Sequence, residues 1–139
     1  MAKLPGPAYG IRTRLSLPFE QAVEETRAAL RREGFGVLSE IDVRKVMKER
    51  LGVDHPNYLI LGACNPPLAR QALLQEEELG ILLPCNVVVY EKEGATVVSA
   101  MNPEVALSIV RNPNLREVAL EAQSRLQHAI DALDRQFGA

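Results

Sequence analysis

Five segments of the chain have patterns typical of β-strands, either apolar and polar residues in alternation or a short apolar run between turn residues. The first segment keeps one polar face, whereas the third is apolar on both sides and should be covered on both faces. The last two segments are predicted to form a hairpin, because Gly94 between them can adopt the positive φ of a tight turn. The predicted strands are residues 9–17, 35–42, 57–64, 84–91 and 95–101.

Five other segments place apolar residues at the spacing of a helix. Three of them begin at a proline, twice after a capping asparagine, and three end at a glycine, which are common start and stop signals of helices. The second of these helices is short, with Val43, Val46, Met47 and Leu51 predicted to face inward. The predicted helices are residues 18–33, 43–51, 66–79, 103–110 and 115–137.

The order of these elements favours an α+β fold over a doubly wound α/β fold. The tight hairpin is antiparallel, and the polar face of the first strand could not be hidden between two layers of helices. We therefore predict a mostly antiparallel sheet of about five strands, with the two long helices packed on one face. The alternative, a doubly wound α/β fold, stays open because helices separate several strands. We expect one domain, residues 1–139, with a loosely ordered lead at residues 1–8.

The composition is that of a globular protein without a nucleic-acid-binding surface. The chain of 139 residues has a formal net charge of −2, 47% hydrophobic residues and no tryptophan. A nucleic-acid-binding face needs a basic excess and stacking aromatic residues, which are missing here. No segment has the length and apolarity of a membrane span, and the N-terminus lacks the features of a secretory signal, so we predict a cytoplasmic protein without a membrane partner.

The candidate chemistry lies in the segment 61–87, where each of the two cysteines is followed by an asparagine. The pairs are Cys64-Asn65 and Cys85-Asn86. In the cytoplasm both cysteines should be free thiols. Cys64 precedes a predicted helix start, and a helix N-terminus favours a thiolate nucleophile. The alternative is structural, because free cysteine is commonly buried and Asn65 is fully explained as a helix cap.

The histidines add little to this site. His55 lies in a loop beside Asp54, where a carboxylate and an imidazole could act as a general base, but the same residues are typical of a turn. The possible metal ligands Cys64, Cys85, His55 and His128 lack the short paired spacing of zinc sites, so we predict no metal site; a site shared across a dimer interface is the alternative. No glycine-rich motif completes a nucleotide fingerprint, and we predict no cofactor.

Several short motifs together resemble a protein family. The resemblance covers residues 9–133 and, through the paired Cys-Asn motifs, is fairly specific for the bacterial and archaeal family called domain of unknown function 302, especially a thermophilic bacterial member. It implies an α+β domain of β-α-β-β-β-β-α type, similar in layout to the TATA-binding-protein-like folds, and it implies no activity. The motifs are Gly34-Phe35-Gly36-Val37, Ile41-Asp42-Val43, Gly62-Ala63-Cys64-Asn65-Pro66, Leu83-Pro84-Cys85-Asn86-Val87 and Asn102-Pro103.

The excess of apolar surface on the third and fourth predicted strands leads to the functional hypothesis. This apolar surface should form either a subunit interface or the wall of a small-molecule pocket. We therefore expect a homodimeric binding module for a small ligand or a protein partner. A thiol-dependent enzyme or redox-responsive protein that uses Cys64 is the second hypothesis, and metal binding at a shared Cys/His site is the third. The candidate ligand-binding residues are Cys64, Asn65, Cys85, Asn86 and His55.

Overall fold

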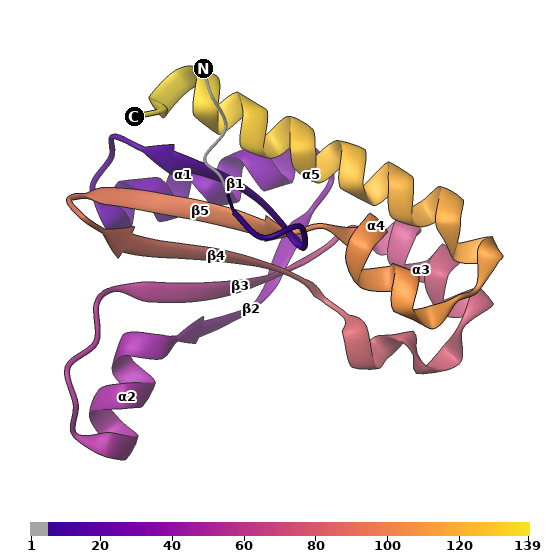
Figure 1. Cartoon of the computed structure of the whole chain (residues 1–139), viewed down its shortest axis with the longest axis horizontal. Coiled ribbons are helices and arrows are strands. Elements are labelled where there is room, and N and C mark those ends of the chain that lie inside the picture. Colours follow the sequence, from indigo (N-terminus) through magenta and orange to yellow (C-terminus); the bar gives the residue numbers. More distant parts are fainter. Residues whose placement is uncertain (1–5) are drawn as a thin grey trace.

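The computed structural model describes residues 6–139, and within them five strands form one antiparallel sheet. Residues 1–5, most of the predicted loose lead, lie outside the described residues. The strand order is β1-β5-β4-β3-β2, and every neighbouring pair is antiparallel (Figure 1). The strands are β1 (Gly10–Leu15), β2 (Gly36–Asp42), β3 (Tyr58–Cys64), β4 (Cys85–Lys92) and β5 (Ala95–Met101).

Helices connect the strands and close the chain. The predicted helices are all present, and those predicted at residues 66–79 and 103–110 are each divided into an α-helix and a 3-10 helix. The α-helices are α1 (Phe19–Arg32), α2 (Val43–Leu51), α3 (Pro66–Gln75), α4 (Pro103–Ala106) and α5 (Arg116–Phe137). The short 3-10 helices are η1 (Glu77–Leu82), η2 (Leu107–Val110) and η3 (Pro113–Leu115).

Helices α1 and α5 pack on the same face of the sheet, as predicted. Buried residues of both helices, among them Leu30 and Leu126, form one core cluster with sheet residues such as Leu61 and Val89. Burial of these side chains is the main driving force for the fold, at roughly 1.5–3 kcal/mol for each large side chain. The α+β fold is confirmed, and the antiparallel pairing of all neighbouring strands rules out the doubly wound alternative.

The predicted helix 66–79 ends early. Asn65 caps its start, because its side-chain oxygen accepts a hydrogen bond from the backbone N–H of Leu68. At the other end, the side chain of Asn112 donates to the carbonyl oxygen of Gln75 at 3.2 Å and to the carboxylate of Glu76 at 3.0 Å. Glu76 is extended, and the chain then turns into η1, which buries Leu79. The change of direction adds a small second core beyond the ends of the strands (Figure 1).

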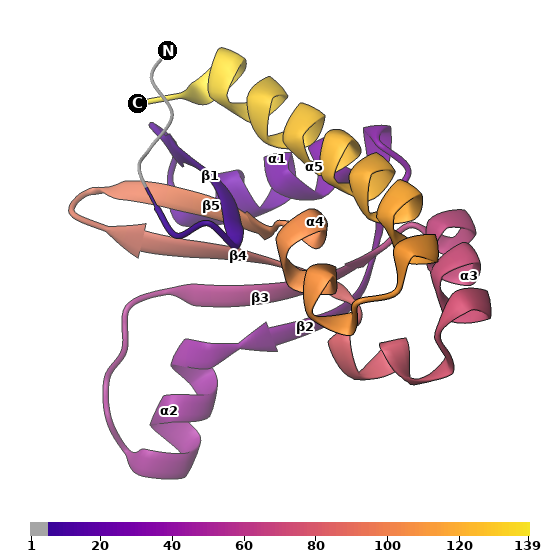
Figure 2. The same ribbon diagram turned by 45° about the vertical axis from the view of Figure 1, so that its right-hand side comes forward.

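This second core lies under the N-terminal half of α5. Figures 1 and 2 show α5 extending past the sheet, with its C-terminal half beside β1 and α1 and its N-terminal half beside α3 and α4. Its buried members come from α3, η1, η2, η3 and α5, and they form a cluster separate from the main core. They are Ala72, Leu79, Leu107, Leu115, Val118 and Ala119.

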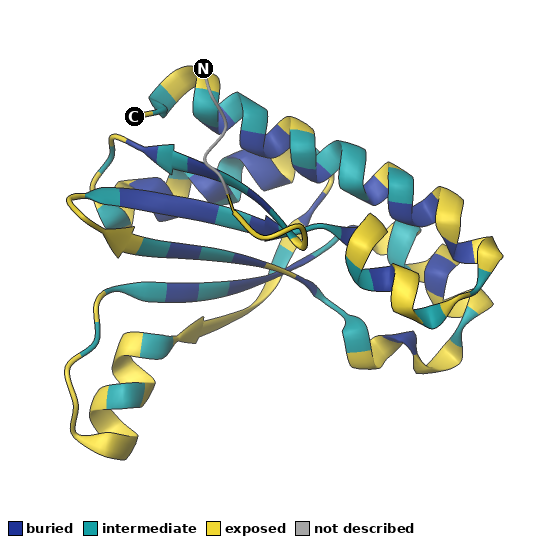
Figure 3. Ribbon diagram, in the orientation of Figure 1, coloured by how far each residue is buried: buried dark blue, intermediate teal, exposed yellow. Residues whose placement is uncertain are grey.

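Helix α2 projects from the corner of the sheet, and none of its residues is buried (Figures 1 and 3). The prediction that its apolar side, Val43, Val46, Met47 and Leu51, faces inward was wrong for Val46 and Leu51, which are exposed; Val43 and Met47 are half-buried. The physical reason is its position: Figure 1 shows it beyond the edge strand β2, away from α1 and α5. Leu51 is 68% exposed. The apolar side of α2 is therefore left partly at the surface.

The face of the sheet opposite α1 and α5 is not covered by a helix layer within residues 6–139, so that part of the chain does not supply the cover expected on the second face of strand 57–64. A register shift between Val37 and Ser39 changes the side to which β2 residues point. Beyond it Ile41 pairs with Ile60, whereas Val37 pairs with Ala63. An unbroken alternation over residues 35–42 would place Ile41 and Val37 on one face; the irregularity places them on opposite faces.

Candidate functional site

The antiparallel pairing of β3 and β4 brings the two Cys-Asn motifs to the same end of the sheet. Cys64 is the last residue of β3, Cys85 is the first residue of β4, and Cys85 pairs with Ala63. A parallel arrangement would have separated them by the length of a strand. Both cysteines are free thiols.

A cavity of about 370 Å³ opens at this end of the sheet. Its volume lies in the lower part of the range of small-molecule sites, roughly 300–1,000 Å³. The strand ends, α3 and α5 supply its walls, together with residues around η1 and α4. Nearly all of the lining side chains are apolar: Phe35, Leu38, Ser39, Ala63, Cys64, Asn65, Leu68, Ala69, Ala72, Leu73, Gly80, Leu83, Pro84, Cys85, Pro103, Leu107, Val118 and Ala122.

The cavity exists because the two core clusters do not close against each other. Phe35 and Cys85 on its wall belong to the main core, whereas Ala72 and Leu107 belong to the second core. Small residues on the two helices, such as Ala72 and Ala122, leave space where larger side chains would fill the gap. Protein interiors are otherwise close-packed, so an opening of this size lined by apolar groups is favourable for an apolar guest.

Gly62 allows the chain to pass closely beside the cavity. A Cβ atom at this position would lie 2.1 Å from Oγ of Ser39 and 2.8 Å from Cγ of Pro84. Ser39 is the cross-strand partner of Gly62, and both Ser39 and Pro84 line the cavity. The absence of a side chain at Gly62 therefore lets Ser39 and Pro84 approach the strand end. The Leu83–Pro84 peptide bond is cis.

The environment of the thiols favours their neutral form. Burial raises the pKa of Cys64. Burial, and after it the nearby Cys64 thiol, raises the pKa of Cys85 to about 11. The proximity of a helix start therefore does not produce the low pKa expected of a reactive cysteine. These observations do not favour the hypothesis of a thiol-dependent enzyme, and they make both cysteines polarizable, neutral parts of an apolar wall.

Comparisons with known proteins agree with the motifs. The family model described as "Domain of unknown function DUF302" matches residues 11–133. The chain belongs to the DUF302 family. A solved structure that resembles this DUF302 protein is the crystal structure of an uncharacterized conserved DUF302 protein from Bacillus stearothermophilus, with a TM-score of 0.83 and 29% identity. The match covers 90% of this chain and 98% of that one. The comparison with curated proteins gave no match.

The structure separates the other candidate residues of this DUF302 protein from the cavity. Asn86 pairs with Gly62 and is exposed, and it is not among the lining residues. His55 lies before β3, at the far end of that strand from Cys64, and its ring packs edge-on against Tyr58 at a centroid distance of 6.1 Å. Of the five candidate residues, only Cys64, Asn65 and Cys85 come together.

The possible metal ligands are also apart. His128 lies on α5 with its Nδ1 3.6 Å from a carboxylate oxygen of Glu33. Within residues 6–139 no three histidine, cysteine or acidic side chains gather in a way that could hold a metal ion. The same part of the chain contains no helix that is both long enough and apolar enough to cross a membrane.

Most of the cavity wall was missed from the sequence. Val118 and Ala122 belong to the apolar stripe of the predicted helix 115–137, a pattern that also fits an ordinary core, and Leu107 was not singled out. A weak signal was present in α3, where Ala69 and Ala72 are small residues three positions apart on the side that faces the cavity. Such spacing indicates that one side of the helix carries small side chains. It does not indicate a cavity, because the opposite wall comes from segments that are distant in the chain.

Proposed function

We propose that this DUF302 protein is a small cytoplasmic binding module that takes an apolar small molecule into the cavity at the ends of β3 and β4. The observation that carries the proposal is the cavity itself, which has a volume of about 370 Å³ and an almost wholly apolar lining. A ligand bound there would gain roughly 0.8 kcal/mol for each buried methylene group. The neutral thiols of Cys64 and Cys85 fit this binding role better than a catalytic one.

A titration with straight-chain alcohols tests the proposal. Octan-1-ol should bind by isothermal titration calorimetry, and each methylene removed from the chain should weaken binding about fourfold, the equivalent of roughly 0.8 kcal/mol. Failure of hexan-1-ol, octan-1-ol and decan-1-ol to bind would contradict the proposal.

A cavity-filling variant locates the binding. Ala69 is partly buried on α3 and lines the cavity, so Ala69→Phe should fill it and abolish binding of octan-1-ol. Ala132→Phe is the matched control: Ala132 is also a partly buried alanine of a helix but is not among the lining residues of the cavity. Equal loss of binding in both variants would speak against the cavity as the site.

The second part of the proposal is that the protein is a homodimer. The uncovered apolar surface of β2 and α2 supports it: Ile41 is 50% exposed, and Val46 and Leu51 on α2 are also exposed. Contiguous exposed apolar groups commonly mark an interaction surface. A second copy of the chain could bury them through a two-fold contact, in which the same patch is used on both subunits.

A further inference from the structure

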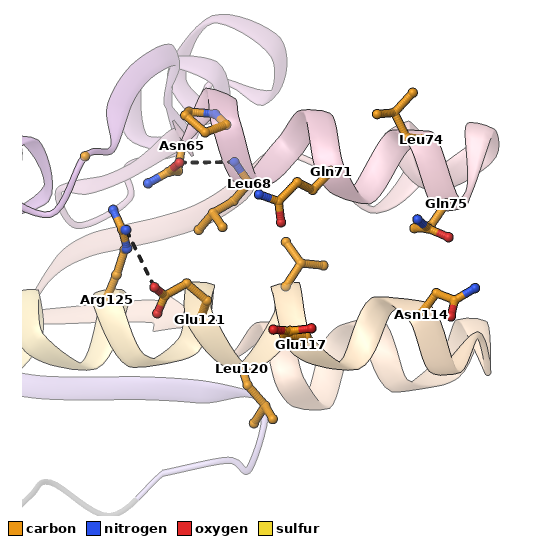
Figure 4. Close-up of a pocket in the computed structure, with 13 residues that line it drawn as sticks. Asn65, Leu68, Gln71, Leu74, Gln75, Asn114, Glu117, Leu120, Glu121 and Arg125 are labelled. Carbon is orange, nitrogen blue, oxygen red and sulfur yellow. Dashed lines mark hydrogen bonds and ion pairs between the residues drawn. The ribbon is translucent and has the colours of Figure 1, made fainter.

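The apolar cavity adjoins a second, polar opening. A groove of about 950 Å³ runs between α3 and α5 (Figure 4), and it shares Asn65, Leu68 and Val118 with the cavity. Away from this shared boundary amide and charged side chains such as Gln71 and Glu117 line the groove beside a few apolar ones, Leu74 and Leu120 among them. A molecule that fills the cavity and extends past the boundary would therefore pass from apolar to polar surroundings.

Two hydrogen-bond donors meet at this boundary. A Cβ atom on Gly34 would lie 2.9 Å from Nδ2 of Asn65 and 3.3 Å from Nη1 of Arg125, so both nitrogens border the space that the glycine leaves open. Figure 4 shows the amide nitrogen of Asn65 and the guanidinium group of Arg125 turned toward one another. Two donors cannot satisfy each other, so their arrangement suits an acceptor placed between them.

The donors have little competition from the protein. Asn65 is only 6% exposed, its side-chain oxygen is used to cap α3, and its Nδ2 makes no hydrogen bond within residues 6–139. Among residues 6–139 the one fully buried side-chain nitrogen or oxygen without a hydrogen-bond partner is Nε of Arg12, so Nδ2 of Asn65 is not fully enclosed and can donate to an acceptor that enters from the groove. Arg125 has one ion pair, with Glu121 at 3.6 Å, and both of these side chains are partly exposed, at 41% and 49%. Such a partly exposed ion pair is weak, so Arg125 can leave it to bind another acceptor.

We propose that the ligand class is a monocarboxylic acid with an apolar body, whose body lies in the cavity and whose carboxylate accepts hydrogen bonds from Asn65 and Arg125. This inference rests on the proposed function and adds the polar end of the ligand to it. A guanidinium group donates two parallel hydrogen bonds to a carboxylate, and such charge-assisted bonds are about twice as strong as neutral ones. The carboxylates of Glu117 and Glu121 would instead favour a positively charged amine. The experiment therefore tests whether the bound head group carries a negative or a positive charge.

Three probes with the same chain length separate the possibilities: octanoic acid, octan-1-ol and octylamine, titrated by calorimetry at neutral pH. Octanoic acid should bind about tenfold tighter than octan-1-ol, since a hydrogen bond to a charged group is worth more than a neutral one by about that factor. Tighter binding of octylamine than of octanoic acid would overturn the inference and assign the head group to the two glutamates.

Variants then assign the contact to the two donors. Arg125→Met should remove the tenfold advantage of the acid, so that octanoic acid and octan-1-ol bind with similar affinity. Asn65→Asp keeps the side-chain oxygen that caps α3 but replaces the donor with a carboxylate, so it should weaken binding of the acid more than binding of the alcohol. Glu121→Gln frees Arg125 and should strengthen the acid. Thermal unfolding of each variant, close to that of the wild type, verifies that the fold is intact.

The outcomes distinguish this inference from the proposed function. Equal binding of acid and alcohol, unchanged in Arg125→Met, would overturn the carboxylate contact and leave the apolar cavity as a binding site. Failure of all three probes to bind the wild-type protein would overturn both.

Discussion

Cys64 ends β3 where Cys85 begins β4, so the two cysteines lie together at one end of the sheet, on the wall of an apolar cavity. Their proximity follows from the antiparallel pairing of the strands and not from any sequence spacing. Burial, and after it this proximity to Cys64, raises the pKa of Cys85, so the Cys85 thiol is a neutral part of the cavity wall.

The raised pKa of Cys85 predicts a loss of stability at high pH. The thiol of the unfolded chain ionises from about pH 9, while the folded thiol stays neutral up to about pH 11, so the unfolded state releases its proton first. The free energy of unfolding should therefore fall by roughly 2–3 kcal/mol over this interval. In Cys85→Ala, denaturant unfolding should show no such fall in the free energy of unfolding, because the titrating thiol is absent. An equal pH dependence in variant and wild type would contradict the assignment.

Occupation of the cavity should protect its thiols. Because Cys64 and Cys85 both line the cavity, saturating octan-1-ol should slow their alkylation by iodoacetamide. The rates can be followed by mass spectrometry in Cys85→Ser and Cys64→Ser, each of which leaves one thiol to report. The same alcohol should have no effect on alkylation in guanidinium chloride, where the cavity is absent. Unchanged rates in the folded protein would mean that the alcohol does not occupy the cavity.

Gly62 should tolerate substitution poorly. Gly62→Ala places a methyl group against Ser39 and Pro84, and we expect a loss of about 1–3 kcal/mol from overpacking. Adding Ser39→Ala removes the closest atom and should recover part of the loss, which makes the two changes non-additive. Gly36→Ala is the control, because a Cβ there meets nothing within 4 Å. Equal urea midpoints for Gly62→Ala and Gly36→Ala would show that the close approach is unimportant.

The surface formed by β2 and α2 should determine the oligomeric state. Ile41→Asp places a charge in this apolar surface and should convert a dimer to a monomer in sedimentation experiments. Ile81→Asp introduces the same charge on η1, where Ile81 is 78% exposed, and should leave the dimer intact. A wild-type monomer, or dissociation only in Ile81→Asp, would exclude an interface on this surface.

The sequence predicted the fold well because its signals are local. Helix starts such as Asn65-Pro66 and the hairpin turn at Gly94 depend on residues close in the chain, and the structure confirms both. The side to which Ile41 points could not be predicted, since a register shift in β2 has no signature in an alternating pattern. The inward orientation predicted for α2 was wrong at Val46 and Leu51 for a different reason: an amphipathic helix has an apolar side whether its own domain or another molecule covers it.

The candidate site was only partly predicted from the sequence. Cys64, Asn65 and Cys85 were identified because a thiol near a helix start can be reactive, whereas burial of the thiols makes them less reactive. The cavity depends on the gap between two core clusters, and Arg125 meets Asn65 across distant segments. No periodicity encodes either relationship, because both arise when α5 packs against α3.

The most direct test of binding in the cavity is an NMR titration of the protein with octan-1-ol, read as shifts of backbone amide signals. Binding in the cavity predicts the largest shifts at Cys64, Ala69, Ala72, Cys85 and Leu107. Shifts confined to β2 and α2, or no saturable shifts at all, would contradict the account.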